Sequence, residues 1–218
     1  VTVDGVCARP GTRVLPGQTV CFQGRSVSQE EERILLAFHK PAGIVCTAEK
    51  REKNNVIDYI HYPKRIYPVG RLDKDSEGLL LLTDDGALAH DLLAPKKHVD
   101  KVYFVRTDGA LDDADCKAFE QGITLGDGLE CLPAKLEILK SDAQSEALIT
   151  IHEGKFHQIK RMLASRGKPV VYLKRLSMGS LTLDEALPRG EYRLLTAEEI
   201  KNLRGSGHFA QGKTGADK

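Results

Sequence analysis

The sequence has no long apolar run, no paired cysteines and no excess of charge of either sign, and these absences exclude several classes of protein. Its longest apolar stretches, such as Leu79–Leu82, span only a few residues, whereas a membrane helix needs about 20. The five cysteines lie at least fourteen residues apart, which fits neither a zinc site nor a disulfide framework. The first residues also lack the basic and then apolar pattern of a signal peptide. We therefore expect a cytoplasmic protein with separate reduced cysteines and no metal site.

The charges are balanced overall but unevenly distributed along the 218 residues, with 32 Lys and Arg against 31 Asp and Glu. Residues 106–146 carry ten carboxylates and four cations, whereas residues 153–175 carry seven cations and one carboxylate. Phe156, His157 and Tyr172 lie between the cations of the second segment. Cations interleaved with aromatic rings suit a phosphate backbone with bases nearby. A net charge of +1 therefore does not exclude RNA, and we expect RNA to meet one basic face.

Composition divides the chain into four parts. Residues 1–24 contain short β-like segments separated by turn dipeptides, and they are too few to bury a core alone. Residues 25–33 are polar and acidic and are predicted to form a linker. Residues 34–203 mix β-like and helical segments without regular alternation, which predicts a compact α+β domain rather than a doubly wound parallel sheet. Gly, Ser, Lys and Gln dominate residues 204–218, which are predicted to be a disordered tail.

Several elements of the large domain follow from local patterns. Ile34–Phe38 and Ile44–Thr47 are predicted strands on either side of a Pro-Ala-Gly break, and Glu130–Leu139 is predicted to be another strand. Lys155–Arg166 has the spacing of an amphipathic helix closed by Gly167. The i, i+3, i+4 and i+7 spacing places on one face of that helix His157, Lys160, Arg161 and Ala164.

Two segments match ligand-binding patterns but lack the surroundings that the patterns need. Residues 207–214 satisfy the phosphate-loop pattern, yet they end four residues before the last residue, so no helix can follow to hold phosphates. Residues 73–84 resemble a calcium loop, but Asp84 stands where a bidentate Glu is expected, and a β-like leucine run follows in place of a helix. We therefore expect neither a nucleotide cofactor nor a bound metal.

Five further segments, in this order, resemble the motifs of the pseudouridine synthases, in the branch that modifies ribosomal RNA and includes the small-subunit (RsuA-like) enzymes. One such motif is weak evidence, but five in the right order are highly specific. They are Lys40-Pro41-Ala42-Gly43, Gly70-Arg71-Leu72-Asp73 with Ser76–Leu80, Lys101-Val102-Tyr103, Glu153–Leu163, and the closing segments Leu181–Leu183 and Gly190–Thr196.

The resemblance implies an enzyme that breaks the bond between uracil and ribose, turns the base and rejoins it through carbon. It implies a mixed, mainly antiparallel sheet with flanking helices. Nothing is oxidised and no group is transferred to water, so no cofactor is required. The implied catalytic residue is Asp73, acting as a nucleophile or as the base for a glycal-type intermediate. A nearby cation would keep its carboxylate ionised.

The resemblance also implies roles for seven other residues. Lys160 stands where the wider superfamily usually has Arg, and it is expected to pair with Asp73, with Arg161 as the alternative partner. Tyr103 is expected to stack on the target uracil, although it could also be an ordinary strand aromatic. Arg71 is the candidate to fill the gap that the flipped base leaves. The expected RNA-binding residues are Arg71, Lys40, His157, Gln158 and Arg161, of which His157 could instead be structural.

Residues 1–24 resemble the C-terminal half of the alpha-L RNA-binding module, whose leading helix pair is not in this chain. The form of residues 157–162 resembles the small-subunit enzymes more than their large-subunit relatives, so the expected substrate is 16S rRNA, free or in a partly assembled small-subunit particle. The alternatives are a 23S rRNA pseudouridine synthase and a non-catalytic RNA-binding protein of ribosome assembly. A nucleosidase is less favoured because no second acidic partner for Asp73 is evident.

Overall fold

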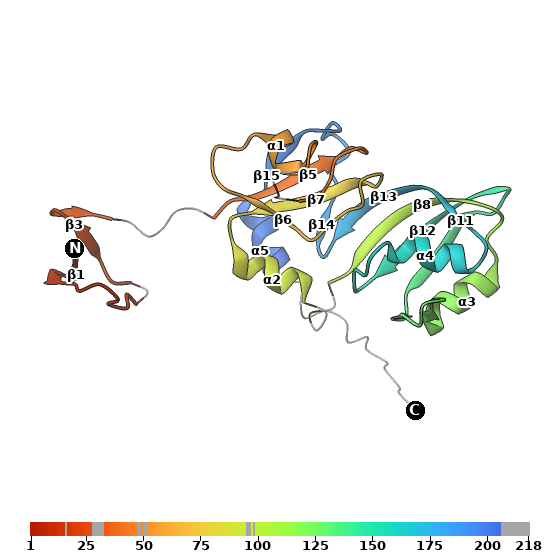
Figure 1. Cartoon of the computed structure of the whole chain (residues 1–218), viewed down its shortest axis with the longest axis horizontal. Coiled ribbons are helices and arrows are strands. Elements are labelled where there is room, and N and C mark those ends of the chain that lie inside the picture. The colour runs from red at the N-terminus through yellow and green to blue at the C-terminus, as the bar shows by residue number, and fades with distance from the viewer. Residues whose placement is uncertain are drawn as a thin grey trace, which may run out of the picture. The chain divides into compact units, whose positions relative to one another are not determined.

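A computed structural model describes residues 1–15, 17–27, 33–47, 49, 52–94, 97 and 99–205. The chain divides into two units, residues 1–33 and residues 34–218 (Figure 1). The described residues include no helix that is long and apolar enough to cross a membrane. The phosphate-loop-like residues 207–214 and most of the predicted tail lie outside the described residues.

The first unit is a small antiparallel sheet in the order β2-β1-β3-β4. Gln23 and Gly24 both have positive φ, the geometry of a tight hairpin turn, so the chain folds back and residues 25 and 26 pair with residues 22 and 21. The sheet therefore extends two residues into the segment that the sequence predicts to be a linker. Its strands are β1 (Thr2–Val3), β2 (Val6–Cys7), β3 (Val20–Phe22) and β4 (Arg25–Ser26).

The second unit has a nine-stranded sheet, which confirms the predicted α+β class with a mixed, mainly antiparallel sheet. Its main order is β11-β12-β8-β13-β7-β5-β15, with β14 beside β13 and β6 beside β7, and among the described strands only β7 and β13 pair in parallel. The strands are β5 (Leu35–Lys40), β6 (Tyr67–Val69), β7 (Glu77–Thr83), β8 (Lys101–Asp108), β11 (Lys135–Lys140), β12 (Gln144–Ile151), β13 (Val170–Met178), β14 (Leu181–Thr182) and β15 (Tyr192–Leu194).

Helices cover both faces of this sheet and form two cores (Figure 1). One core packs against the helices α1 (Val56–Ile60), α3 (Asp113–Gln121) and α4 (Gln158–Ser165). The other packs against α2 (Gly86–Leu93) and α5 (Ala197–Gly205). Strand β7 lies between the two cores, and its leucines alternate between them, which explains why Leu79–Leu82 is apolar without interruption.

Four details differ from the sequence predictions. Residues 44–47 form no strand; Val45 makes one isolated bridge with Asn55. The predicted strand at 130–139 is two strands, β11 and the short β10 (Glu130–Cys131), which pairs with β9 (Ile123–Thr124). Helix α5 continues to Gly205, two residues into the predicted tail. Helix α4 begins only at Gln158, so the predicted helical face loses His157.

The two halves of the sheet meet where β7 lies beside β13. The pairing there is short, Glu77 with Lys174 and Gly78 with Arg175. Gly78 has a φ of +105°, and a Cβ on it would lie 2.2 Å from the carbonyl oxygen of Arg175. Only glycine permits this approach, because both the space and the backbone conformation exclude a side chain.

We predict that Gly78→Ala lowers the free energy of unfolding by about 3 kcal/mol or more, since it combines a backbone clash with a strained φ. The control is Gly126→Ala, where a Cβ would meet nothing within 4 Å, and this change should cost less than about 0.5 kcal/mol. Urea denaturation of the two variants measures the difference. Equal stability of the two variants would show that the junction is not tightly packed.

Candidate active site

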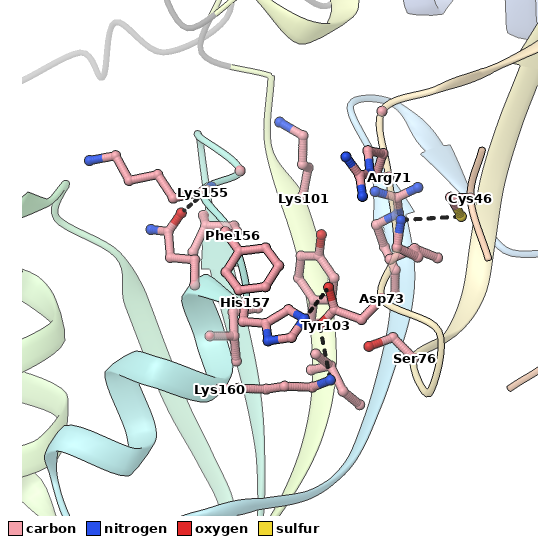
Figure 2. Close-up of a pocket in the computed structure, with 18 of the residues that line it drawn as sticks. Cys46, Arg71, Asp73, Ser76, Lys101, Tyr103, Lys155, Phe156, His157 and Lys160 are labelled. Atoms are coloured by element: carbon pink, nitrogen blue, oxygen red, sulfur yellow. Dashed lines mark hydrogen bonds and ion pairs between the residues drawn. The ribbon is translucent and has the colours of Figure 1, made fainter. Parts of the chain in front are cut away.

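A cavity of about 600 Å³ opens on the large domain beside the junction of the two half-sheets (Figure 2). The loop between β6 and β7, strands β8 and β13, and the segment that leads into α4 all contribute to its wall. It brings together three residues predicted to be catalytic from separate parts of the sequence, Asp73, Tyr103 and Lys160. Arg71, His157 and Gln158 also line it.

Asp73 and Lys160 form an ion pair at the wall of this cavity. The Nζ atom of Lys160 lies 2.9 Å from Oδ2 of Asp73 and 2.5 Å from Oδ1 of Asp75. Burial opposes the charge of Lys160, but the hydrogen bonds to Asp75 and Asp73 outweigh it, so the pKa of Lys160 lies above its ordinary value. The same hydrogen bond is the main cause of the lowered pKa of Asp75. One ammonium therefore serves two carboxylates.

The second oxygen of Asp73 faces His157, whose Nε2 lies 3.6 Å from Oδ1 (Figure 2). His157 has a positive φ of 50° and immediately precedes α4. Its ring stacks on Phe156 at 3.9 Å, and Phe156 is 72% exposed. The two stacked rings line the cavity together with Tyr103. The prediction of a helix through His157 did not anticipate this arrangement, because a left-handed backbone conformation is not recognisable from residue spacing.

Lys40 does not reach the RNA-accessible surface, so its predicted role as an RNA contact is wrong. Its side chain is fully buried, and Nζ donates hydrogen bonds to the carbonyl oxygens of Pro41, Asp73, Lys74 and Ser76 at 2.8–3.3 Å. The lysine thus holds the loop that carries Asp73 from beneath. Burial is the main cause of its lowered pKa.

Gln158 and Arg161 also have partners within the protein. Gln158 lines the cavity but is buried; its amide donates to Glu153 at 2.8 Å and accepts from the backbone N–H of Lys155. Both hydrogen bonds anchor the start of α4, and the predicted contact of Gln158 with RNA stays a prediction. Arg161 pairs with Asp127 at 2.5 Å rather than with Asp73, so the alternative pairing is wrong.

The predicted basic face is partly neutralised by the acidic stretch of the sequence. Asp127 holds Arg161, and buried Asp115 holds Arg166 at 2.9 Å. Arg175 is itself buried, with 2% of its surface exposed. The two oppositely charged segments thus pair with each other in part. Counting charges along the sequence could not show this, because it does not reveal which residues meet in space. Arg71 remains exposed at the cavity.

Several cavity residues with reactive or polar side chains were not identified from the sequence as site residues. Four of these are Cys46, Ser76, Lys101 and Arg175. The thiol of Cys46 accepts a hydrogen bond from the backbone N–H of Leu72, which supports the loop next to Asp73. Strand alternation was a usable signal for Lys101, because it lies two residues before Tyr103 and hence on the same face. Arg175 becomes part of the site only through the pairing of β13 with β8.

Among the residues that the structure describes, no group of three or more His, Cys, Asp or Glu side chains is arranged to hold a metal ion. The cavity offers a carboxylate with a shared ammonium, three aromatic rings, and further cations at Arg71, Lys101 and Arg175.

Comparison with known proteins shows the family of this chain. Residues 34–165 match the family model described as RNA pseudouridylate synthase. The chain is 45% identical over 191 residues to the Bacillus subtilis (strain 168) protein named uncharacterized RNA pseudouridine synthase YtzG, covering 85% of this chain and 79% of that protein. It is 39% identical to the ribosomal small subunit pseudouridine synthase A of Vibrio cholerae serotype O1, and 35% identical to the Escherichia coli (strain K12) protein of that name. Both cover 93% of this chain and 88% of the relative.

Solved structures show the same fold. A crystal structure of a pseudouridylate synthase matches with a TM-score of 0.74 and 35% identity, over 93% of this chain and 87% of the other. The archaeal box H/ACA Nop10–Cbf5 complex contains a chain that matches with a TM-score of 0.53 at 18% identity, over 72% of this chain and 51% of the other, which is a likeness of fold alone. The chain therefore belongs to the RNA pseudouridylate synthase family, whose members are enzymes that isomerise uridine in RNA.

Proposed function

We propose that this enzyme converts one uridine of 16S rRNA to pseudouridine, with Asp73 as the essential carboxylate and no cofactor. The observation that carries the proposal is the pairing of Asp73 with Lys160 inside a cavity that also holds Tyr103. The choice of 16S rRNA is supported by relatives named ribosomal small subunit pseudouridine synthase A, which match over 93% of the chain.

The geometry around Asp73 suits a carboxylate that must stay ionised and still react. Lys160 occupies Oδ2, and Asp75 helps to keep that ammonium charged. Oδ1 has only the more distant His157 near it at 3.6 Å, among the contacts that the described residues make. This oxygen is free to attack the sugar or the base, or to remove a proton for a glycal-type intermediate.

Lys160 makes one contact with Asp73, whereas an arginine would offer a planar fork. The compact ammonium accommodates both Asp73 and Asp75, which lie two residues apart on one loop. We assign to Lys160 the role of fixing the Asp73 carboxylate and maintaining its charge.

We assign the binding of the flipped nucleotide to aromatic and basic side chains around the cavity. Tyr103 stacks on the uracil from the sheet, and Phe156 and His157 line the same cavity. Arg71 is exposed beside Asp73 and takes the place of the extruded base in the RNA.

The N-terminal unit, residues 1–33, is proposed to contact RNA as half of an alpha-L module. Phe22 and Arg25 on its sheet are exposed, as are Arg9 and Arg13 in the segment between β2 and β3. This combination of cations and an aromatic ring suits phosphates and bases. We propose that the substrate is met in the cytoplasm, either as free 16S rRNA or in a partly assembled small-subunit particle.

Incubation of the protein with 16S and 23S rRNA, followed by mapping of pseudouridine, tests the proposal. Wild type should modify one 16S uridine, and Asp73→Asn should lower the rate by at least about a thousandfold because it removes the reacting carboxylate. RNA binding by this variant should persist. Full activity of Asp73→Asn contradicts the catalytic assignment, modification confined to 23S rRNA contradicts the substrate, and binding without modification by wild type favours a non-catalytic assembly protein.

Exposed Arg71 and half-buried Arg161 should differ in their contribution to RNA affinity. Arg71→Ala should weaken binding and reduce the slope of log K against log salt by about 1, because Arg71 can contact phosphate directly. Arg161→Ala should weaken it less, since RNA must compete with Asp127 for this guanidinium. Titrations over a salt series, with exposed Lys135→Ala as the charge control, measure both. A larger effect of Arg161 would overturn this ranking.

Removal of the buried lysine should impair catalysis through the loop. Lys40→Met leaves four carbonyl oxygens without their donor, so we expect a loss of about 2–4 kcal/mol in stability. In the fraction that remains folded, single-turnover pseudouridine formation should fall while RNA affinity stays within about twofold. If Lys40→Met weakens RNA binding but leaves the single-turnover rate unchanged, Lys40 contacts RNA directly, as the sequence predicts and its burial argues against.

A further inference from the structure

Two buried cations line the cavity without a carboxylate partner. Arg175 and Lys101 are 2% and 6% exposed, respectively. Within the described residues neither forms an ion pair with a carboxylate, in contrast to Lys160, which has two. A buried cation without a counter-ion is costly, and sites that retain one commonly supply the negative partner from a ligand.

The positions of these two cations are set by the sheet. Lys101 and Tyr103 lie two residues apart on β8, so their side chains point to the same face. Arg175 on β13 is the cross-strand partner of Tyr103, on the same face of the sheet. The proposed stacking ring is therefore flanked on two sides by positive charge, at the floor of the cavity rather than at its exposed rim.

Their hydrogen-bonding groups are only partly used by the protein. The Nε atom of Arg175 donates to the carbonyl of Leu79 at 2.7 Å, but its buried Nη2 has no partner in the described part of the chain. Nζ of Lys101 donates to the carbonyl of Val99 at 3.1 Å, which leaves further N–H groups of the ammonium. Because these N–H groups lie beside the ring of Tyr103, they can reach the edge of a base that stacks on that ring.

We propose that Arg175 and Lys101 bind the carbonyl oxygens of the target uracil and stabilise the uracil anion formed during the reaction. This inference rests on the proposed function. When the C1′–N1 bond breaks, its electron pair stays with the base, and the negative charge spreads over N1, O2 and O4. The same electron pair of the base forms the bond from C5 to C1′, and C5 then loses its proton while N1 gains one, which gives pseudouridine. Fixed cations at the oxygens stabilise this intermediate and keep the detached base in place while it turns.

A phosphate is the other anion that these cations could take, but the geometry favours the base. Tyr103 and both cations share the floor of the cavity, and all three are more than 90% buried. The RNA backbone remains outside, where exposed Arg71 is available. The two anions can be distinguished by changing the base, because a substituent on the ring alters the stability of the uracil anion but not the charge of a phosphate.

The charge of Lys101 depends on groups from three elements. The pKa of Lys101 is lowered to about 8, mainly by burial and in part by the charge of Arg175 on β13. Asp100, its neighbour in sequence, and Glu153, before α4, oppose this shift. Lys101 is therefore charged below about pH 8 in the free enzyme, and kcat/KM should fall as the pH rises through that value. In Lys101→Arg, whose guanidinium stays charged, the fall should move to higher pH.

The test uses single-turnover reactions on the rRNA fragment that wild type converts, with either uridine or 5-fluorouridine at the target position. Lys101→Met should slow loss of the target uridine by about a hundredfold, as removal of one donor to a developing anion does. With 5-fluorouridine as the target, Lys101→Met should slow the reaction by about tenfold or less relative to wild type. Fluorine withdraws electrons and so stabilises the uracil anion even without the cation. RNA affinity should stay within about twofold, and Lys135→Met should match wild type in every assay.

Each other outcome overturns the inference. Equal slowing on both substrates, together with weaker RNA binding, indicates a phosphate contact. Equal slowing by Lys101→Met and Lys101→Arg at every pH indicates a structural role. Arg175→Gln should show the same dependence on fluorine; if it does not fold, the Lys101 variants still decide. If the wild-type protein modifies no rRNA uridine, the proposed function is overturned as well. If the wild-type protein is active and Lys101→Met reacts at the same rate, only this inference is overturned.

Discussion

The approach of Gly78 to the backbone of Arg175 is the contact on which the site depends. It joins the two halves of the sheet along the short parallel pairing between β7 and β13. Asp73 lies on the loop that precedes β7, whereas Tyr103 lies on β8, which pairs with β13. The distance between the carboxylate and the aromatic platform is therefore set by this junction. A side chain at residue 78 would separate the halves, and with them the groups that must act together.

Charge in the cavity is arranged in two different ways, and each suits a different task. Lys160 is shared by Asp73 and Asp75, so its positive charge is balanced within the protein. Arg175 and Lys101 have no such partner among the described residues and lie beside Tyr103. Their uncompensated charge favours a ligand that becomes negative. The cavity thus separates a group that must remain an anion from a place where a second anion can form.

Burial reassigns residues whose type and motif suggest contact with RNA. Lys40 is a cation in a motif, but its ammonium holds four backbone carbonyls beneath the Asp73 loop. Gln158 is polar and next to the cavity, yet its amide anchors the start of α4. Arg161 and Arg166 are occupied by carboxylates from the acidic stretch. The basic face is consequently smaller than the charge count of residues 153–175 indicates.

The sequence by itself determined the α+β class and the family resemblance, because turn chemistry, apolar periodicity and ordered motifs are local signals. The Asp73–Lys160 pair was expected only because the resemblance implies it. It did not determine the left-handed backbone of His157, the burial of Lys40 or the place of Arg175 beside Tyr103. Those depend on which strands pair and in what register, and on which carbonyls a side chain meets after packing. Residues far apart in the chain become neighbours only when the sheet closes. The tertiary structure therefore decided which cations hold the backbone, which pair with carboxylates and which line the cavity.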